Sequence, residues 1–171
     1  MWDSAFKQAL QGEVTEAMRL LLPNLEAIHF LSSEGSSELE EGILLATSEF
    51  SMRTPLGSHG EGMRRLMMMS LSLLESRGGV LLVDEIDTGL HYSILGDVWR
   101  LVIETAIKHD VQVFATTHSY DCIRGLSWLC ESYPHLAQEV SLQKIEPTLE
   151  RSVSLRADQI IFAFEHSMEM R

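Results

Sequence analysis

The sequence has few lysines, few cysteines and no long hydrophobic run. Its 171 residues include only the lysines Lys7, Lys108 and Lys144, and the formal net charge is −12. This acidic balance argues against a surface broadly suited to nucleic acid or an anionic membrane, although a local basic patch is compatible with it. The longest apolar runs, at 66–69 and 80–83, are far too short to span a bilayer. We therefore expect no membrane partner, and the charge does not indicate nucleic-acid binding.

The only cysteines, Cys122 and Cys130, lie in a segment that we expect to form one helix. Eight helical positions correspond to about 12 Å, which is too far for a disulfide. We predict reduced core thiols, which are typical of cytosolic proteins, and favour this over a redox or metal-binding role. The N-terminal segment lacks the apolar core and cleavage site of a signal peptide, so the expected location is cytoplasmic.

A glycine-rich phosphate loop of the form GxxxxGK[ST] is also missing from the chain. The backbone amides and the lysine of such a loop are the main attachment for nucleotide phosphates in proteins that use it. A nucleotide-dependent activity of this chain therefore needs a phosphate loop from another segment or partner.

The length and the hydrophobic content of 45% predict a single domain with a substantial core. At the N-terminus, an apolar stripe predicts a helix over 3–22, which Pro23 ends. Two strands are expected at 25–32 and 42–50. The polar stretch between them, including the acidic residues 34–41, predicts a hairpin with an exposed tip.

The middle of the chain alternates helices and strands. A helix over 60–76 precedes a strand at 80–83, and a helix over 93–108 leads to a strand at 111–115, so this part has the size of a βαβ unit. The apolar run 80–83 is expected to be central and buried on both faces, as in a parallel sheet. If a covering lobe is missing, these strands expose an apolar face that promotes self-association.

The C-terminal part is expected to begin with a helix capped by Ser119 and to end with a helix starting near Asp158. Two short strands, 140–145 and 152–155, lie between these helices. We find no internal repeat and no interdomain linker.

Two acids follow directly on the strand 80–83. Asp84 is suited to hold a magnesium ion through a water molecule, and Glu85 to polarise the water that attacks a phosphoanhydride. A strand also ends in acids simply because solvent begins there, and this interpretation would be preferred for an isolated pair. The neighbouring motifs favour the catalytic interpretation.

Two further segments carry residues suited to phosphate chemistry. His118 follows the second strand, where a ring N–H can contact a γ-phosphate; the alternative is that it caps the next helix. The small-residue turn Ser58–Gly62 opens a helix, and its backbone amides and the helix N-terminus both favour an anion. An ordinary capped loop is the alternative for this turn.

Taken in order, S-x-G-E, an apolar strand with D-E, and T-H-S resemble the C-terminal half of an ABC-type ATPase head. The most similar branch is the AAA-domain branch related to SMC and OLD-family proteins, and the resemblance covers residues 50–120. It implies an α/β, P-loop NTPase-like C-terminal lobe with a parallel sheet core and flanking helices. In this interpretation one domain, 1–171, consists of an N-terminal helix with a β-hairpin (1–50) and a motif-bearing core (51–171).

The resemblance also implies roles for individual residues. Ser58, Gly60 and Glu61 correspond to the signature motif, which contacts ATP held by a second head. Asp84 corresponds to the Walker B acid, which holds magnesium through water, and Glu85 to the catalytic glutamate. Two further elements complete the set: the D-loop, formed by Asp87, Gly89, Leu90 and His91, and the switch histidine, His118.

ATP and magnesium are the ligands that this resemblance implies. The implied partner is a second ATPase head or a Walker A-bearing partner, in a homo- or hetero-oligomer. The Walker A motif and a convincing Q-loop are missing, so we expect a truncated, split or fragmentary ATPase that is inactive alone. The D-loop lacks the terminal aspartate common in transporter heads, and is more similar to that of the SMC-related branch.

Two other functions compete with ATP hydrolysis. The first is a non-catalytic interaction module that docks on a complete ATPase. The second is a metal-dependent hydrolase, with Asp84, Glu85, Asp87, His91 and His118 as its candidate residues. The hydrolase is less favoured because the ATPase motif order explains these residues and also the turn at Ser58. The process coupled to ATP use stays open among DNA processing, phage defence and signalling.

Several conspicuous residues have simpler interpretations. The methionine run Met67–Met69 predicts helix packing rather than a soft-metal site, and Arg64–Arg65 a solvated helix face. The tryptophans Trp2, Trp99 and Trp128 fit core or edge packing better than base stacking.

Overall fold

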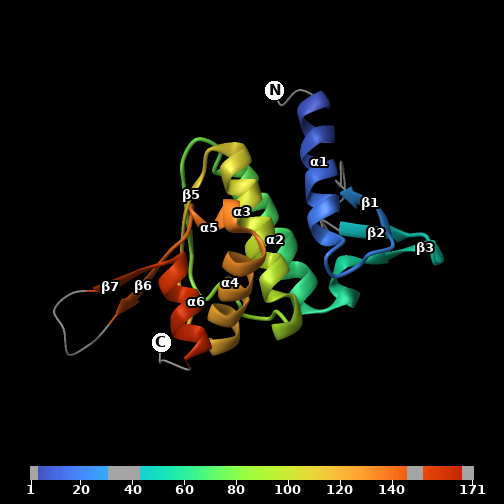
Figure 1. The fold of residues 1–171 in the computed structure, drawn as a ribbon. Coiled ribbons are helices and arrows are strands. Elements are labelled where there is room, and N and C mark those ends of the chain that lie inside the picture. Colours follow the sequence, from blue (N-terminus) through green and yellow to red (C-terminus); the bar gives the residue numbers. More distant parts are fainter. Residues whose placement is uncertain (1–3, 31–42, 146–151, 167–171) are drawn as a thin grey trace. The chain divides into compact units, whose positions relative to one another are not determined.

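The fold is seen in a computed structural model that describes three ranges of the chain, 4–30, 43–145 and 152–166. Its contacts divide the chain into two compact units, Met1–Glu75 and Ser76–Arg171 (Figure 1). The interpretation of the whole chain as one domain stays a prediction. The predicted acidic loop tip and the packing of Trp2 lie outside the described residues. Within those ranges, no helix is both long enough and apolar enough to cross a membrane.

The first unit packs a helix against an antiparallel sheet. Helix α1 spans Ser4–Met18, and the strand order is β1 (Leu25–Phe30), β2 (Ile43–Thr47) and β3 (Phe50–Pro55). The helix ends four residues before the predicted boundary at 22, because turn-type bonds such as Leu21 N to Met18 O, 3.1 Å, replace the helical pattern ahead of Pro23.

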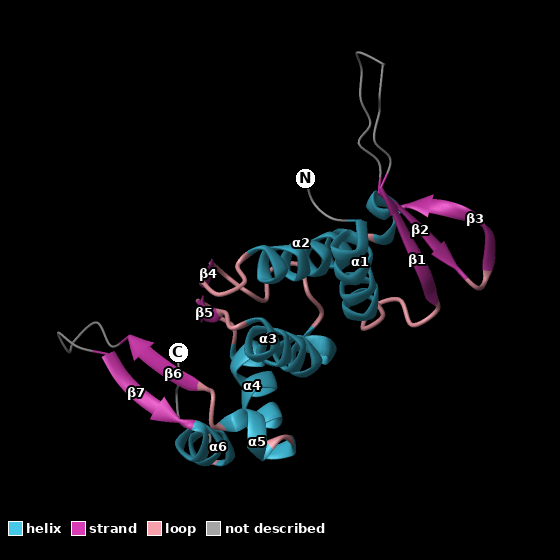
Figure 2. Cartoon of the chain, turned by 90° about the horizontal axis from the view of Figure 1, so that it is seen from above, coloured by secondary structure: helices cyan, strands magenta, loops and turns pink. Residues whose placement is uncertain are grey.

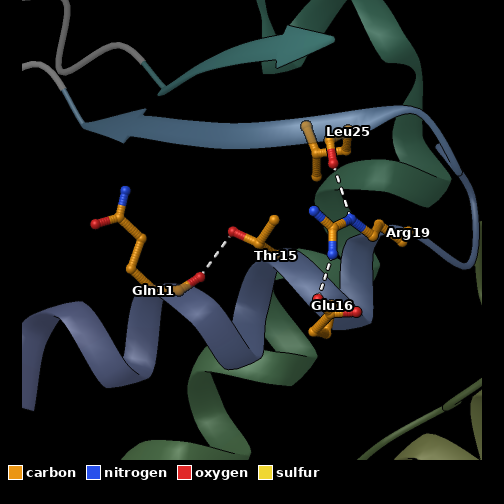
Figure 3. A network of polar contacts seen from close by, with 5 residues as sticks. All are labelled: Gln11, Thr15, Glu16, Arg19 and Leu25. Atoms are coloured by element: carbon orange, nitrogen blue, oxygen red, sulfur yellow. Dashed lines mark hydrogen bonds and ion pairs between the residues drawn. The ribbon is translucent and has the colours of Figure 1, made fainter. Parts of the chain in front are cut away.

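Polar side chains attach α1 and the turn after it to β1 (Figure 3). Arg19 Nε donates to Leu25 O at 2.8 Å, and the same guanidinium pairs with Glu16. One turn of helix before Thr15, Gln11 Nε2 donates to the carbonyl of Ile28 in β1. Within the helix, the Thr15 hydroxyl donates to Gln11 O at 2.7 Å. The helix is therefore held along the strand by hydrogen bonds as well as by apolar packing.

The sheet has one strand more than predicted, and the prediction of a single strand at 42–50 is wrong. A turn at Ser48 and Glu49 divides this stretch into β2 and β3, and Thr47 pairs with Phe50 across it. The extra strand is not predicted because it shows no clear apolar alternation: Met52 and Arg53 are both exposed.

The first unit ends in a short 3₁₀ turn, η1 (Leu56–His59), and helix α2 (Glu61–Glu75), which matches the helix expected at 60–76. The methionine run is confirmed as packing for Met67 and Met69, which are buried, whereas Met68 is exposed. The core of this unit joins residues of α1, the sheet and α2: Val14, Met18, Leu25, Ile28, Leu45, Leu66, Met67 and Leu73.

The second unit contains the predicted βαβ arrangement. Strands β4 (Val80–Val83) and β5 (Gln112–Ala115) pair in parallel, and the connection between them contains η2 (Tyr92–Ile94) and α3 (Leu95–His109). Figure 2 shows these two strands side by side, with α3 alongside them. The α/β class and the parallel pair are therefore confirmed.

One prediction about this pair is wrong: β4 is not buried on both faces. Val80 and Leu82 are 56% and 74% exposed, and Phe114, which pairs with Leu82, is 54% exposed. Leu81 and Val83, on the opposite face, are only partly buried. The apolar run reflects a strand that offers one face to solvent, because the described part of this sheet has only two strands and nothing covers that face.

The rest of the second unit is a helical layer with a terminal hairpin. Its elements are α4 (Tyr120–Ser132), α5 (Pro134–Ala137), the antiparallel pair β6 (Ser141–Ile145) and β7 (Ser152–Arg156), and α6 (Ala157–Glu165). Among these elements, α5 alone is not in the predicted order. It packs against α4 through a cluster of buried residues, Leu129, Cys130, Leu136 and Ala137, against which Trp99 of α3 also packs.

Candidate functional site

The candidate site residues fall into two groups, one in each unit. Ser58, Gly60 and Glu61 belong to the first unit, whereas the acids, the loop after them and His118 belong to the second.

The signature-like turn is the 3₁₀ segment η1 and the first turn of α2. Ser58 is exposed, and its hydroxyl donates to Pro55 O at 2.6 Å. Gly60 has φ +86°, a conformation that L side chains rarely adopt, and links η1 to the helix. His59 fixes the turn to the sheet, because its Nε2 lies 2.7 Å from the Thr54 hydroxyl.

A cation lies directly on this turn. The Arg64 guanidinium lies close to Gly57: a Cβ placed on this glycine would come within 2.8 Å of Arg64 Nη2. Arg64 also forms an exposed ion pair with Glu61 at 3.6 Å. The prediction of a solvated helix face holds for Arg64 as regards exposure, but its side chain covers the turn.

The acid pair lies where β4 ends. The last strand residue, Val83, pairs with Ala115, and the parallel bonding continues beyond the strands with Thr116 N to Val83 O at 2.9 Å and Ile86 N to Thr116 O at 3.0 Å. Asp84 and Glu85 are thereby held beside the segment that follows β5. Both are exposed, while the next residue, Ile86, is fully buried and anchors the loop.

Glu85 has an unusual backbone conformation. Its φ is +47°, in the left-handed region that costs an L residue roughly 1–2 kcal/mol. Its amide donates to the Thr116 hydroxyl at 3.0 Å, and its Oε2 accepts from the Thr88 hydroxyl at 3.1 Å. Backbone and carboxylate are both restrained, so this left-handed residue is stabilised by its surroundings.

The residues expected to form the D-loop make two consecutive turns. Thr88 N donates to Glu85 O and Leu90 N to Asp87 O, each at 3.0 Å, and Gly89 has φ +77°. Asp87 accepts from the Thr117 hydroxyl. His91 is used locally: it caps η2, and its Nδ1 lies 2.8 Å from Ser93 Oγ.

His118 is exposed and lies between two residues that organise the start of α4. Ser119 is the N-cap, accepting from Cys122 N at 3.2 Å, as predicted. Thr117 Oγ1 accepts from Ser119 N at 3.0 Å. The alternative in which His118 itself caps the helix is therefore wrong.

The two cysteines are buried, free thiols on α4, as predicted. Burial raises the pKa of Cys122 to about 11, while hydrogen bonds with Thr117 and Trp99 act in the opposite direction. Burial also raises the pKa of Cys130 to about 11. Both side chains are thus neutral thiols near neutral pH and are poor nucleophiles.

The arrangement does not support the metal-dependent hydrolase. Among the described residues, which include all five of its candidate ligands, no three His, Cys, Asp or Glu side chains are grouped to hold a metal ion. His91 and Asp87 instead contact Ser93 and Thr117.

Three hydroxyl residues of the site are missed by the sequence analysis. Thr88, Thr116 and Thr117 each donate to one of the acids. The only sign in the sequence is the pair of threonines immediately before His118, where polar residues replace the apolar pattern of the strand.

Comparisons with known proteins show the family and the fold of the chain. The sequence pattern of a family described as "AAA domain, putative AbiEii toxin, Type IV TA system" matches residues 5–121, more than half of the chain. A Helicobacter pylori (strain ATCC 700392 / 26695) protein described as an ATP/GTP phosphatase is 23% identical over 124 residues. That match covers 68% of this chain, and the chain spans 30% of the relative's length.

The fold is that of SMC ATPase heads. A structure from work on ATP-driven dimerization and DNA-stimulated activation of SMC ATPases has a TM-score of 0.61 at 13% identity, covering 96% of this chain and 94% of that one. A Smc head bound to the C-winged-helix domain of ScpA has a TM-score of 0.59 at 15% identity, covering 92% and 45%. A Pyrococcus furiosus Smc head bound to the C-terminal domain of ScpA has a TM-score of 0.57 at 14% identity, covering 95% and 38%.

Proposed function

Because the chain belongs to the AAA-domain family described as a putative AbiEii toxin of type IV toxin–antitoxin systems, we propose that it is the C-terminal half of an SMC-like ATPase. It binds and hydrolyses ATP when a Walker A-bearing segment or partner completes the site. The observation that carries this proposal is the acid pair at the end of a parallel strand, hydrogen-bonded to the segment that leads to His118.

The donor set at the strand end fits magnesium. Carboxylate and hydroxyl oxygens are the ligands that this ion prefers, and Asp84 offers a carboxylate whose orientation is fixed by the Thr116 hydroxyl. Asp84 would hold the ion through a water molecule. Bound magnesium supplies positive charge that offsets the charge of the phosphates.

Glu85 and His118 have separate roles in this proposal. Glu85 polarises the attacking water by accepting its proton on the carboxylate, and the hydrogen bond from Thr88 limits the positions that this carboxylate can take. His118, at the end of the neighbouring segment, contacts the γ-phosphate through its ring. Asp87, Gly89, Leu90 and His91 form the D-loop of the same head.

The phosphate cradle is what the chain does not supply, and this supports a composite site. No GxxxxGK[ST] loop exists in the sequence. The exposed apolar face of the parallel pair, defined by Val80, Leu82 and Phe114, has the character of a surface that another strand-bearing segment covers. We assign that surface to the Walker A-bearing part.

The signature turn acts on a second nucleotide. Ser58, Gly60 and Glu61 contact ATP held by the opposite head, so the working assembly contains two heads, as in the ATP-driven dimerization studied for SMC ATPases. The Ser58 side chain is exposed, and the Arg64 guanidinium beside Gly57 adds positive charge that favours a phosphate at this turn.

The test is ATP hydrolysis and ATP-dependent association of the chain complemented with a Walker A-bearing head segment, on the same polypeptide or as a separate partner. Ser58→Arg should block association, because the long arginine side chain fills the position where the phosphate of the ATP held by the opposite head docks. His118→Ala should permit association and slow turnover. Size-exclusion chromatography with ATP, paired with phosphate release, measures both effects.

Matched outcomes separate this proposal from the interaction module. Ser132→Arg, at the exposed end of α4, is the control and should leave both quantities close to wild type. Association without any ATP turnover would instead indicate a non-catalytic module that docks on a complete ATPase. Unchanged association and turnover in Ser58→Arg would show that the signature assignment is wrong.

A further inference from the structure

Two consecutive threonines, Thr116 and Thr117, connect the segment after β5 to the acids after β4. Neither residue belongs to the ATPase groups named so far. Both lie one or two residues beyond the last strand residue, Ala115, and immediately before His118. Four of the hydrogen bonds of their hydroxyl groups reach a residue of the site or the cap of the helix that follows it.

Thr116 holds the acid pair. Its hydroxyl donates to Asp84 Oδ1 and accepts the amide of Glu85 at 3.0 Å. One oxygen atom thus fixes the carboxylate of the first acid and the backbone of the second. The bond to the carboxylate is charge-assisted, which makes it stronger than a bond between neutral groups. The bond to the amide stabilises Glu85 in its left-handed conformation.

Thr117 holds the next turn and the next helix. Its hydroxyl donates to Asp87 Oδ1 and accepts the amide of Ser119 at 3.0 Å. Ser119 in turn caps α4. A continuous series of hydrogen bonds therefore runs from Asp87 through Thr117 and Ser119 into α4, and His118 lies within it.

We propose that Thr116 and Thr117 are positioning residues, which fix the acid pair and Asp87 relative to His118. This inference rests on the proposed ATPase function of those groups. Groups that orient a metal-binding carboxylate typically change metal affinity or activity about 10–100-fold when they are removed. Displacement of the His118 segment is transmitted through the two hydroxyls to the acids and the D-loop, because Thr116 bonds to Asp84 and Glu85 and Thr117 bonds to Asp87.

The decisive variants replace a hydroxyl by a methyl group of similar size. In the complemented ATPase, Thr116→Val should lower kcat about 10–100-fold and raise the magnesium concentration needed for half-maximal rate, while KM for ATP changes less than about twofold. Thr116→Ser keeps the hydroxyl and should restore most of the activity. Thr105→Val, on α3, is the control and should behave as wild type.

Thr117→Val is expected to act through Asp87. Asp87→Ala and Thr117→Val should each lower kcat, and the double variant should be no slower than the slower single variant, because both remove the same hydrogen bond. In the uncomplemented chain, amide exchange should accelerate at Glu85 in Thr116→Val and at Ser119 in Thr117→Val. This measurement also verifies that each variant is folded.

The outcomes separate the two claims. If the complemented wild type hydrolyses ATP and Thr116→Val has the same kcat and the same magnesium dependence, the positioning role alone is overturned. A slow Thr116→Ser variant overturns it as well, because the hydroxyl is then not what matters. Absence of turnover in the complemented wild type overturns the proposed ATPase function, and the positioning role is overturned with it.

Discussion

The two neighbouring acids differ in what they contact. Asp84 bonds to Thr116 through its carboxylate, whereas Glu85 is held by its amide and accepts from Thr88 at the end of a longer side chain. The carboxylate of Asp84 is thus held at the strand end by Thr116, while the carboxylate of Glu85 is held by Thr88 in the loop that follows. This difference assigns distinct effects to the two amide substitutions.

In the complemented ATPase, Glu85→Gln should lower kcat by roughly 10²–10⁴-fold and leave ATP binding intact, because an amide keeps the shape but cannot accept the proton of water. Asp84→Asn should also weaken magnesium-dependent ATP binding, because it removes negative charge near the ion. Single-turnover hydrolysis and equilibrium nucleotide binding measure the two effects. Equal and small losses in both variants would reduce the pair to an ordinary strand end.

The thiols give a pH prediction for the chain alone. An unfolded cysteine titrates near 9.0, while the folded pKa of Cys122 and of Cys130 is about 11. The folded-state values are raised, so the stabilisation is complete below pH 9 and is lost as the pH rises from about 9 toward 11, where only the unfolded chain releases these protons.

Urea unfolding at pH 8, 9 and 10 measures this dependence. The wild type should lose more unfolding free energy across that range than Cys122→Ala/Cys130→Ala, in which the two titrations are absent. At pH 8, both thiols should react with a disulfide reagent only after unfolding. Identical pH slopes in the two proteins would contradict the burial argument.

At this scale the sequence was informative about which residues carry charge and poor at showing what holds them. Asp84, Glu85 and His118 are recognisable because a polar residue directly after an apolar strand is conspicuous. The hydroxyls of Thr88, Thr116 and Thr117 are not, since a threonine is equally at home in a strand, a turn or on a surface. The contacts of Thr116 and Thr117 join residues that are 30 or more positions apart in the sequence, and are visible only in the folded chain.

Among the elements, α3 and α4 approach closely through glycine. A Cβ on Gly125 would lie 2.9 Å from the backbone of Leu95 and Gly96, and a Cβ on Gly96 would lie 2.4 Å from the ring of Trp128. Trp99 adds a hydrogen bond from its ring N–H to Cys122 O at 2.9 Å. The two tryptophans are confirmed as packing residues of this helix pair.

Gly125→Ala should destabilise the chain by about 1–3 kcal/mol, because the new methyl group meets backbone atoms that cannot rotate away. The matched control is Gly12→Ala in α1, where a Cβ meets nothing within 4 Å. That variant should gain roughly 0.5–1 kcal/mol, since glycine is unfavourable within a helix. Thermal unfolding followed by circular dichroism measures both, and a stabilised Gly125→Ala would contradict the close packing.

Element boundaries follow the same logic. The helices α2, α3 and α4 are predictable because their apolar residues recur with helical spacing and because Ser119 is a good cap. Strand β3 is missed because an exposed edge strand needs no apolar face. The burial of β4 is overestimated because an apolar run indicates which residues favour burial, but does not show whether another segment packs against them.

At the scale of the whole molecule, the exposed face of Val80, Leu82 and Phe114 should drive self-association. Leu82→Thr keeps β-propensity while removing apolar surface, and should reduce the weight-average mass at high concentration. Ile145→Thr is the control, because Ile145 is 80% exposed on the separate β6–β7 pair. Sedimentation velocity over a concentration series measures the difference, and a wild type that stays monomeric throughout would count against the exposed face.

The left-handed backbone at Glu85 has a consequence for reading mutational scans. A position at φ +47° accepts glycine, asparagine and aspartate readily and penalises valine, isoleucine and threonine through their branched Cβ, whatever the chemistry of the site. A mutational scan that measures only activity therefore mixes two causes of lost activity at position 85. If Glu85 has the proposed catalytic role, asparagine and glutamine variants report on proton transfer, whereas branched variants report on the shape of the loop that carries the side chain.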